Sequence, residues 1–340
     1  MFRRAGSGRP AGAADTVPRV SGREPDVLVI GAGVCGLTTA ICLAEAGLEV
    51  TVRAARPPLE TTSAAAGAIW GPHLVDEGGQ VARWGIVTLE ILRGLAGQPG
   101  TGVRTVQGIQ ASRHPAEPPG WLDPLPGWRR CGPAELPAGF VTGWLYAAPV
   151  LTMPVYLGYL LDRFGAAGGD VQVATVGSLA AAAADAPVVV NCTGIGAREL
   201  VPDPGLRPVR GQAVIVANPG ITDFFIGPAE TGPDFVYMFP HGDTVLLGGT
   251  EQHGDWNLDC DPEISRRILA RCTAVEPRLA GAEILEQRVG LRPVRSRVRF
   301  DTEQLEPGRL LVHNYGHGGS GVTLAWGCAR DITRRVAGGA

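Results

Sequence analysis

The chain has 340 residues, a mass of 35.4 kDa and a formal net charge of −3, and its 30 Lys+Arg residues are all arginine. Because no lysine is present, Schiff-base and pyridoxal-phosphate catalysis and the phosphate-loop lysine are excluded. The lack of a basic excess argues against a nucleic-acid partner, and the length favours two lobes over a single core.

The seven cysteines are odd in number and never form a C-x-x-C pair, so neither a disulfide framework nor a metal site is expected. They suit a reducing cytoplasm. Residues 1–25 carry five arginines and no apolar segment, which predicts a disordered leader and excludes a secretory signal there. No run approaches the roughly 18 apolar residues of a membrane span, so no membrane partner is expected.

The first predicted element is the apolar segment VLVI at residues 27–30, which is typical of a buried parallel strand. The turn GAGVCG follows at 31–36, then a helix to residue 46 that Gly47 ends, then a second strand at 50–52. This order predicts a βαβ unit at the start of a doubly wound α/β lobe.

The remaining elements alternate less regularly. Residues 94–143 are rich in Gly, Pro, Trp and Arg and show no long period, which assigns them to a different lobe. Asp261 and Pro262 predict a helix start, with Ile264, Ile268, Cys272 and Val275 on one stripe. Further helices are predicted at 153–164 and from about 321 to 336. Strands are predicted at 171–176, 188–190, 213–216, 245–247, 291–299 and 310–312. The strand at 310–312 is predicted to be the last strand of the chain.

The glycine turn has a physical interpretation as a dinucleotide site. Gly31 permits the tight turn, Gly33 lets the backbone approach a pyrophosphate, and Gly36 lets the helix pack closely on the strand. A glycine-rich turn without a ligand is the competing interpretation. NAD, NADP and FAD stay open, because Ala54 and Ala55 stand where an acidic ribose ligand is expected; Arg56 is either a 2′-phosphate ligand or a solvated side chain.

Seven short blocks occur in a distinctive order: GAGVCG (31–36), AAG (65–67), NCTG (191–194), RGQ (210–212), LGGT (247–250), GLRPVR (290–295) and HNYGHGGSG (313–321). From about residue 26 to 337 the chain resembles the D-amino-acid oxidase family of flavoproteins, which includes D-aspartate oxidases. The resemblance implies an α/β fold (α+β overall). A Rossmann-like, doubly wound lobe formed by 26–80, 150–205 and 290–338 would bind FAD non-covalently, and 81–149 with 206–289 would form a substrate lobe on a mixed β-sheet.

The resemblance also implies roles for residues. Arg292 and Tyr237 would bind the substrate carboxylate, the carbonyl of Gly319 would receive the amine, and His73 matches a histidine of D-aspartate oxidases. The implied cofactor residues are Gly31, Ala32, Gly33, Val34, Gly36, Arg56, Thr61, Thr62, Ser63, Ala66, Gly67, Val173, Thr193, Gly194, Arg292, Gly318, Gly319, Gly321, Val322 and Thr323. No side chain would act as an acid or base, because the substrate Cα would give a hydride to flavin N5 and O2 would reoxidise the flavin. The products would be a 2-oxo acid, ammonia and hydrogen peroxide.

Several alternatives stay open. Arg292 lies in an arginine-dense stretch, Tyr237 alternates like a core residue, and His313 and His317 are interpreted as supports of the flavin loop. Neutral D-amino acids are favoured, because no arginine stands between residues 225 and 234 for a second carboxylate. D-aspartate, a cyclic or secondary amine of a biosynthetic pathway, and a non-catalytic nucleotide-binding module are the alternatives; a homodimer is possible.

Overall fold

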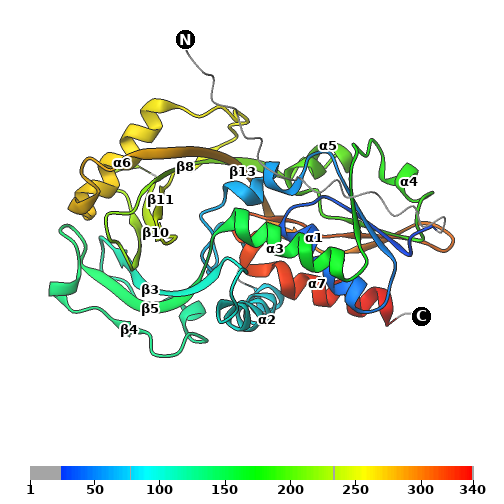
Figure 1. Cartoon of the computed structure of the whole chain (residues 1–340), viewed down its shortest axis with the longest axis horizontal. Coiled ribbons are helices and arrows are strands. Elements are labelled where there is room, and N and C mark those ends of the chain that lie inside the picture. Colours follow the sequence, from blue (N-terminus) through cyan, green and yellow to red (C-terminus); the bar gives the residue numbers. More distant parts are fainter. Residues whose placement is uncertain (1–23, 77, 233, 339–340) are drawn as a thin grey trace, which may run out of the picture.

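The computed structural model describes residues 24–76, 78–232 and 234–338, so that all but the last two residues of the predicted leader lie outside the described residues. Two sheets lie side by side (Figure 1), with helix α6 (Pro262–Val275) over one of them and helices α1 (Val34–Glu45), α3 (Met153–Ala166) and α7 (Gly321–Ala337) over the other. The predicted α/β class with parallel and antiparallel sheets is confirmed.

The first sheet is six-stranded. Its order is β14 (Thr302–Glu306), β15 (Arg309–His313), β7 (Val188–Asn191), β1 (Val27–Ile30), β2 (Val50–Ala54) and β6 (Asp170–Val173). All neighbours are parallel except β14, which pairs antiparallel with β15. The βαβ start predicted from the sequence is therefore confirmed, and β1 lies at the centre of the sheet.

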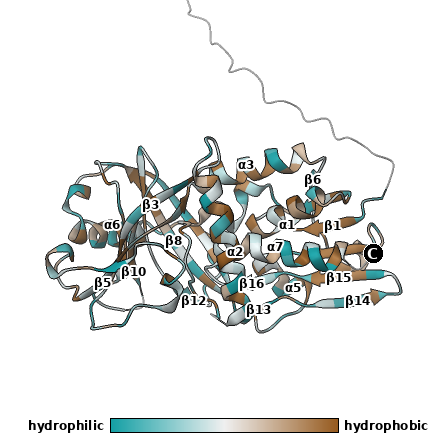
Figure 2. Cartoon of the chain, turned by 90° about the horizontal axis from the view of Figure 1, so that it is seen from below, coloured by the Kyte–Doolittle hydropathy of each residue, from teal (hydrophilic) through white to brown (hydrophobic). Residues whose placement is uncertain are grey.

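Both faces of β1 are buried, which explains why its sequence is wholly apolar. Val27 and Val29 pack in the cluster that includes α1, α3 and α7, whereas Leu28 and Ile30 pack with residues of α4 (Leu179–Ala182) on the opposite face. In Figure 2, β1 and β15 are coloured largely hydrophobic and the edge strand β14 largely hydrophilic. In the described residues, no helix is both long and apolar enough to cross a membrane.

The second sheet is ten-stranded and mixed. Its path is β16 (Tyr315–His317), β13 (Ile284–Arg299), β8 (Arg207–Ala217), β11 (Thr244–Gly248), β10 (Phe235–Pro240), β9 (Phe224–Pro228), β3 (Val103–Ser112), β5 (Thr142–Leu151) and β4 (Arg129–Arg130), while β12 (Gln252–His253) pairs with β8. Strand β3 is parallel to β9, and the other pairs are antiparallel. Residues 290–299, predicted to belong to the FAD lobe, continue β13 in this second sheet.

Some elements were missed from the sequence, and one prediction of an element was wrong. Residues 103–112 and 142–151 form ten-residue strands; β5 is buried on both faces, which removes the alternation that would have revealed it. Helix α2 (Gly79–Ala96) was missed because it begins at a glycine pair without a side-chain cap, although Trp84, Thr88, Leu92 and Leu95 follow a helical period. The strand at 310–312 is not the last, because β16 follows it.

Helix α6 has the capped start that the sequence predicts. The Asp261 carboxylate accepts hydrogen bonds from the backbone N–H groups of Glu263 and Ile264, and Pro262 begins the helix. Ile264, Ile268 and Cys272 are buried against the second sheet, whose Val236 and Met238 lie in the same cluster. Because side chains alternate along a strand, the residues between them, including Tyr237, face the opposite side, where the cavity lies. A short helix, α5 (Ala197–Leu200), completes the set of described α-helices.

Candidate active site

One large cavity, of about 1100 Å³, lies between the two sheets. It extends from the turn between β1 and α1 to residues of β10 and β13. The volume exceeds the roughly 300–1,000 Å³ of ordinary ligand pockets. There is therefore room for an extended ligand together with a second, smaller molecule.

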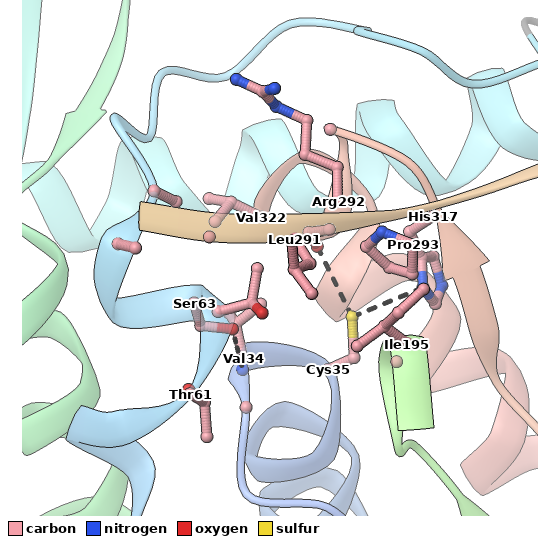
Figure 3. Close-up of a pocket in the computed structure, with 18 of the residues that line it drawn as sticks. Val34, Cys35, Thr61, Ser63, Ile195, Leu291, Arg292, Pro293, His317 and Val322 are labelled. Carbon is pink, nitrogen blue, oxygen red and sulfur yellow. Dashed lines mark hydrogen bonds between the residues drawn. The ribbon is translucent and has the colours of Figure 1, made fainter. Parts of the chain in front are cut away.

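The glycine turn forms one wall of the cavity. Gly31 has φ +110°, and a Cβ placed there would lie 2.4 Å from the carbonyl oxygen of Cys192. A Cβ on Gly36 would lie 1.8 Å from the Gly31 oxygen, so this glycine allows the close packing of helix on strand that the motif predicts. The backbone N–H of Val34 donates to Ser63 Oγ at 2.9 Å (Figure 3), and the first turn of α1 carries no acidic residue. These features suit an anionic group at the helix N-terminus.

A second loop, between β16 and α7, forms another part of the cavity wall. The Gly319 N–H donates to the carbonyl of His73 at 3.0 Å, and the Ser320 hydroxyl donates to the same oxygen. Gly318 has φ +56° and packs against Leu74, where a Cβ would lie 1.9 Å from the carbonyl oxygen. The chain between β16 and α7 is thus tied to the 73–74 segment by the backbone itself.

His317 lies under this loop as a buried, uncharged group. Its Nδ1 is 3.8 Å from the Cys35 thiol, drawn in Figure 3, and its Nε2 is 3.7 Å from the Cys328 thiol. Burial lowers the pKa of His317 to about 4 and raises the pKa of both thiols. A neutral imidazole between two protonated thiols packs and does not exchange protons at neutral pH. The supporting role predicted for His317 agrees with this placement.

Arg292 and Tyr237 come together at the other end of the cavity. The Nη1 atom of Arg292 donates to the Thr250 carbonyl at 2.9 Å. The Tyr237 ring stacks on Phe239, with centroids 4.9 Å apart. Burial raises the pKa of the Tyr237 hydroxyl, against the opposing effect of Arg292, so the hydroxyl stays a neutral donor. The pair thus offers a planar cation and a neutral O–H to one ligand, a combination that suits a carboxylate.

Most of the predicted site residues line this cavity. They are His73, Tyr237, Arg292, Gly31, Ala32, Gly33, Val34, Arg56, Thr61, Thr62, Ser63, Ala66, Gly67, Thr193, Gly194, Gly318, Gly319, Gly321 and Val322. They come from segments up to 291 residues apart in the sequence, which the two sheets bring together. Their individual roles stay predictions.

Three predicted residues are placed differently. Gly36 packs against the Gly31 carbonyl, as described above. The Thr323 hydroxyl donates to the Gly71 carbonyl at 2.8 Å and accepts from its N–H at 3.2 Å, so it ties α7 to residue 71. The Val173 side chain is 60% exposed, and the cavity wall there begins at the next residue, Ala174.

Sequence reasoning missed the aromatic wall at the substrate end. The cavity is also lined by Trp70, Gln110, Trp121, Tyr146 and Ile226. Trp121 packs edge-on against Trp70 and Tyr146, and the Tyr146 hydroxyl donates to Gln110 Oε1 at 3.2 Å. For Trp121, the tryptophan-rich composition of residues 94–143 was the available signal, but only the tertiary structure shows that this side chain lines the cavity.

The residues present fit a dinucleotide flavin. The glycine turn, the acid-free start of α1 and Ser63 would hold its pyrophosphate, while Ala54, Ala55 and Arg56 line the side where its ribose would lie. Two carboxylates that the sequence analysis did not consider, Glu60 and Glu199, also line the cavity. The loop 317–322 would cover the ring system, and the seat of Arg292 and Tyr237 lies in the same cavity.

Comparisons with known proteins agree with this site. A family described as FAD dependent oxidoreductase (DAO) matches residues 26–335. The chain is 48% identical over 305 residues to a D-amino-acid oxidase of Rubrobacter xylanophilus, covering 89% of this chain and 93% of the relative. It is 45% identical over 314 residues to a D-amino-acid oxidase of Streptomyces coelicolor, covering 92% and 97%.

A solved structure shows the same fold. The glycine oxidase of Geobacillus kaustophilus superposes with a TM-score of 0.78 at 18% identity, covering 92% of this chain and 94% of that chain. The prediction of FAD as the cofactor is confirmed by the family match. The chain belongs to the DAO family of FAD dependent oxidoreductases.

Proposed function

We propose that this protein is a D-amino-acid oxidase that deaminates neutral D-amino acids, giving a 2-oxo acid, ammonia and hydrogen peroxide with O2 as the electron acceptor. The observation that carries the proposal is that Arg292 and Tyr237, which together suit a carboxylate, line the same cavity as the glycine turn of a dinucleotide site. The names of the two relatives, at 48% and 45% identity, support the D-amino-acid substrate class.

The residues of the chain bind and orient the substrate in this proposal. Arg292 would grip the α-carboxylate with two parallel N–H donors, and the Tyr237 hydroxyl would donate to the same group. The Gly319 carbonyl would accept from the amine. With both ends held, Cα would face one direction only. Bound FAD would supply the two-electron acceptor.

Purified protein is expected to be yellow and to bleach anaerobically on addition of a D-amino acid but not of its L-enantiomer. A peroxide-release screen over D- and L-amino acids, glycine and sarcosine measures the substrate class directly. Bleaching by secondary amines with no response to D-alanine or D-methionine would replace the proposal by an imino-acid oxidase. Bound flavin with no peroxide from any compound would indicate a nucleotide-binding module.

The cellular location and the assembly belong to this proposal as well. All seven cysteines lie in the described part of the chain and are free, which supports a reducing compartment such as the cytoplasm. Cell fractionation checks this location. Light scattering after size-exclusion chromatography checks whether the protein forms a homodimer.

A further inference from the structure

The side-chain amide of Gln110 lies in the aromatic wall of the cavity and has no part in the function described so far. Gln110 is half-buried and lines the cavity. Its Oε1 atom accepts a hydrogen bond from the Tyr146 hydroxyl at 3.2 Å. Its Nε2 atom has no acceptor among the described residues, and it is not one of the buried side-chain atoms that lack a partner. Two N–H donors are therefore accessible from the cavity.

Tyr146 determines which end of this amide is left over. Burial raises the pKa of Tyr146, so its hydroxyl keeps its proton and needs an acceptor. Gln110 Oε1 is the acceptor that the described residues provide, and the reverse orientation of the amide would leave the buried hydroxyl proton unpaired. The Tyr146 ring is held in turn by Trp121, edge-on at 5.6 Å, and by Phe224 at 5.0 Å. The free end of the amide is therefore the donor end.

The register of the second sheet places Gln110 in one row with Tyr237. Gln110 of β3 pairs with Ile226 of β9, and Ile226 pairs with Tyr237 of β10. Residues paired in this way lie on the same face of a sheet, and neighbouring strands are roughly 4.8 Å apart, so that Gln110 is about 10 Å from Tyr237 along the row. All three residues line the cavity. A substrate whose α-carboxylate is held by Arg292 and Tyr237 can extend its side chain over Ile226 towards Gln110.

We propose that Gln110 is a specificity-determining residue, whose Nε2 atom donates to an acceptor oxygen at the tip of the substrate side chain. The substrates favoured in this way are D-amino acids with a side-chain carboxamide, such as D-asparagine and D-glutamine, over apolar D-amino acids of the same shape. This inference rests on the proposed function and names a substrate subclass for the same site.

The surroundings of Gln110 agree with such a contact. The indole N–H of Trp70 already donates to the Gly85 carbonyl at 2.9 Å, and the Tyr146 hydroxyl donates to Gln110 itself, so neither of these two donors is left for a substrate. Ile226 offers an apolar surface to the methylene groups of the substrate side chain. A polar tip placed beyond Ile226 would lose its hydration without a partner if Gln110 did not donate to it.

The first test compares substrates of equal shape, of which one lacks the acceptor. The pairs are D-asparagine with D-leucine, and D-glutamine with D-homoleucine. In Gln110→Leu we expect the kcat/KM ratio of carboxamide to apolar substrate to fall on the order of tenfold, because one hydrogen bond to the substrate is lost. The ratio cancels any general effect of the substitution on turnover. Gln107→Leu, at an exposed position of the same strand outside the cavity, is the matched control and should keep the ratio.

Tyr146→Phe tests the orientation of the amide. This change removes the hydroxyl that holds Gln110 Oε1 but keeps the ring that packs on Trp121 and Phe224. The kcat/KM ratio should fall by less than in Gln110→Leu, because the amide keeps its donors but no longer holds one orientation. A ratio equal to that of the wild type would show that Tyr146 does not position the amide.

A binding measurement gives a readout without turnover. Calorimetric dissociation constants of succinamate and its apolar isostere, 4-methylpentanoate, are compared in the wild type and Gln110→Leu; succinamate should lose on the order of tenfold relative to 4-methylpentanoate. Unchanged ratios in both the kinetic and the binding measurement would overturn the role of Gln110. A wild type that oxidises no D-amino acid at all would contradict the proposed function instead, and the binding ratios would still test Gln110.

Discussion

Arg292 and Tyr237 reach their positions because three glycines leave the space for them. A Cβ on Gly211 of β8 would lie 2.6 Å from the guanidinium of Arg292. A Cβ at Gly248, the last residue of β11, would lie 2.0 Å from the Tyr237 ring, and one at Gly249, the next residue, would lie 2.3 Å from it. The glycines of the RGQ and LGGT blocks therefore provide room for Arg292 and Tyr237.

Arg292→Leu is expected to keep the flavin and to raise KM for D-amino acids about 100-fold, since a bidentate charged contact of roughly 3 kcal/mol is lost. Steady-state kinetics and the flavin absorbance spectrum measure both properties. Arg297→Leu, which changes an exposed arginine of the same strand, is the control. Equal KM values in the two variants would refute the assignment of the carboxylate to Arg292.

At the scale of elements, strand β8 has residues with separate roles on the two faces of the second sheet. Gly211 faces the cavity, while Arg210 and Gln212 hold the loop between β12 and α6. The Nε and Nη2 atoms of Arg210 donate to the carbonyls of Asn257 and Asp259, at 2.8 and 2.5 Å. Leu258, the residue between these carbonyls, lines the cavity. A buried arginine thus fixes the loop that covers part of the site.

Arg210→Met is expected to lower the free energy of unfolding by about 3 kcal/mol, because the charge-assisted hydrogen bonds of a buried guanidinium are lost. Urea unfolding measures the stability, and limited proteolysis reports whether residues 254–261 become accessible. Arg266→Met, at a side chain that is 71% exposed on α6, should stay within about 0.5 kcal/mol of the wild type. Equal stability of the two variants would show that the loop is held by other contacts.

At the scale of the whole molecule, folding keeps two histidines uncharged. Burial lowers the pKa of His317 and of His241 to about 4, from an ordinary value of 6.5. The unfolded chain therefore binds more protons than the folded chain between pH 6.5 and 4. The stability contributed by these neutral histidines is complete above pH 6.5 and is lost as the pH falls towards 4.

His241→Gln tests this pH dependence outside the main cavity. Nδ1 of His241 lies 3.1 Å from Thr152 Oγ1, and a glutamine can replace that contact without titrating. Urea unfolding at pH 7, 6 and 5 should show a pH dependence flatter by up to about 1.4 kcal/mol per pH unit, the contribution of one proton. Parallel curves for variant and wild type would mean that folding does not change the pKa of His241.

The fold was predictable wherever local sequence and tertiary environment agree. Strand β1 and its glycine turn combine a buried strand with strained backbone positions that only glycine tolerates, so the sequence carries both signals. Strand β5 and helix α2 were missed, because burial on both faces removes alternation and a glycine start removes the capping signal. The aromatic wall of Trp121 and Tyr146 could not be assigned for a related reason: composition does not say which face a side chain occupies.

By itself, the sequence determined the chemistry that is possible: no lysine amine, a dinucleotide turn, and Arg292 in a block that resembles a flavoprotein family. Only the tertiary structure decided which charges act together. His73 and Glu251 are 178 positions apart, and no local pattern relates them, yet they lie 2.9 Å apart beside Arg292. The strength of an electrostatic interaction depends on distance and burial, and for such distant residues the packing of the two sheets sets both.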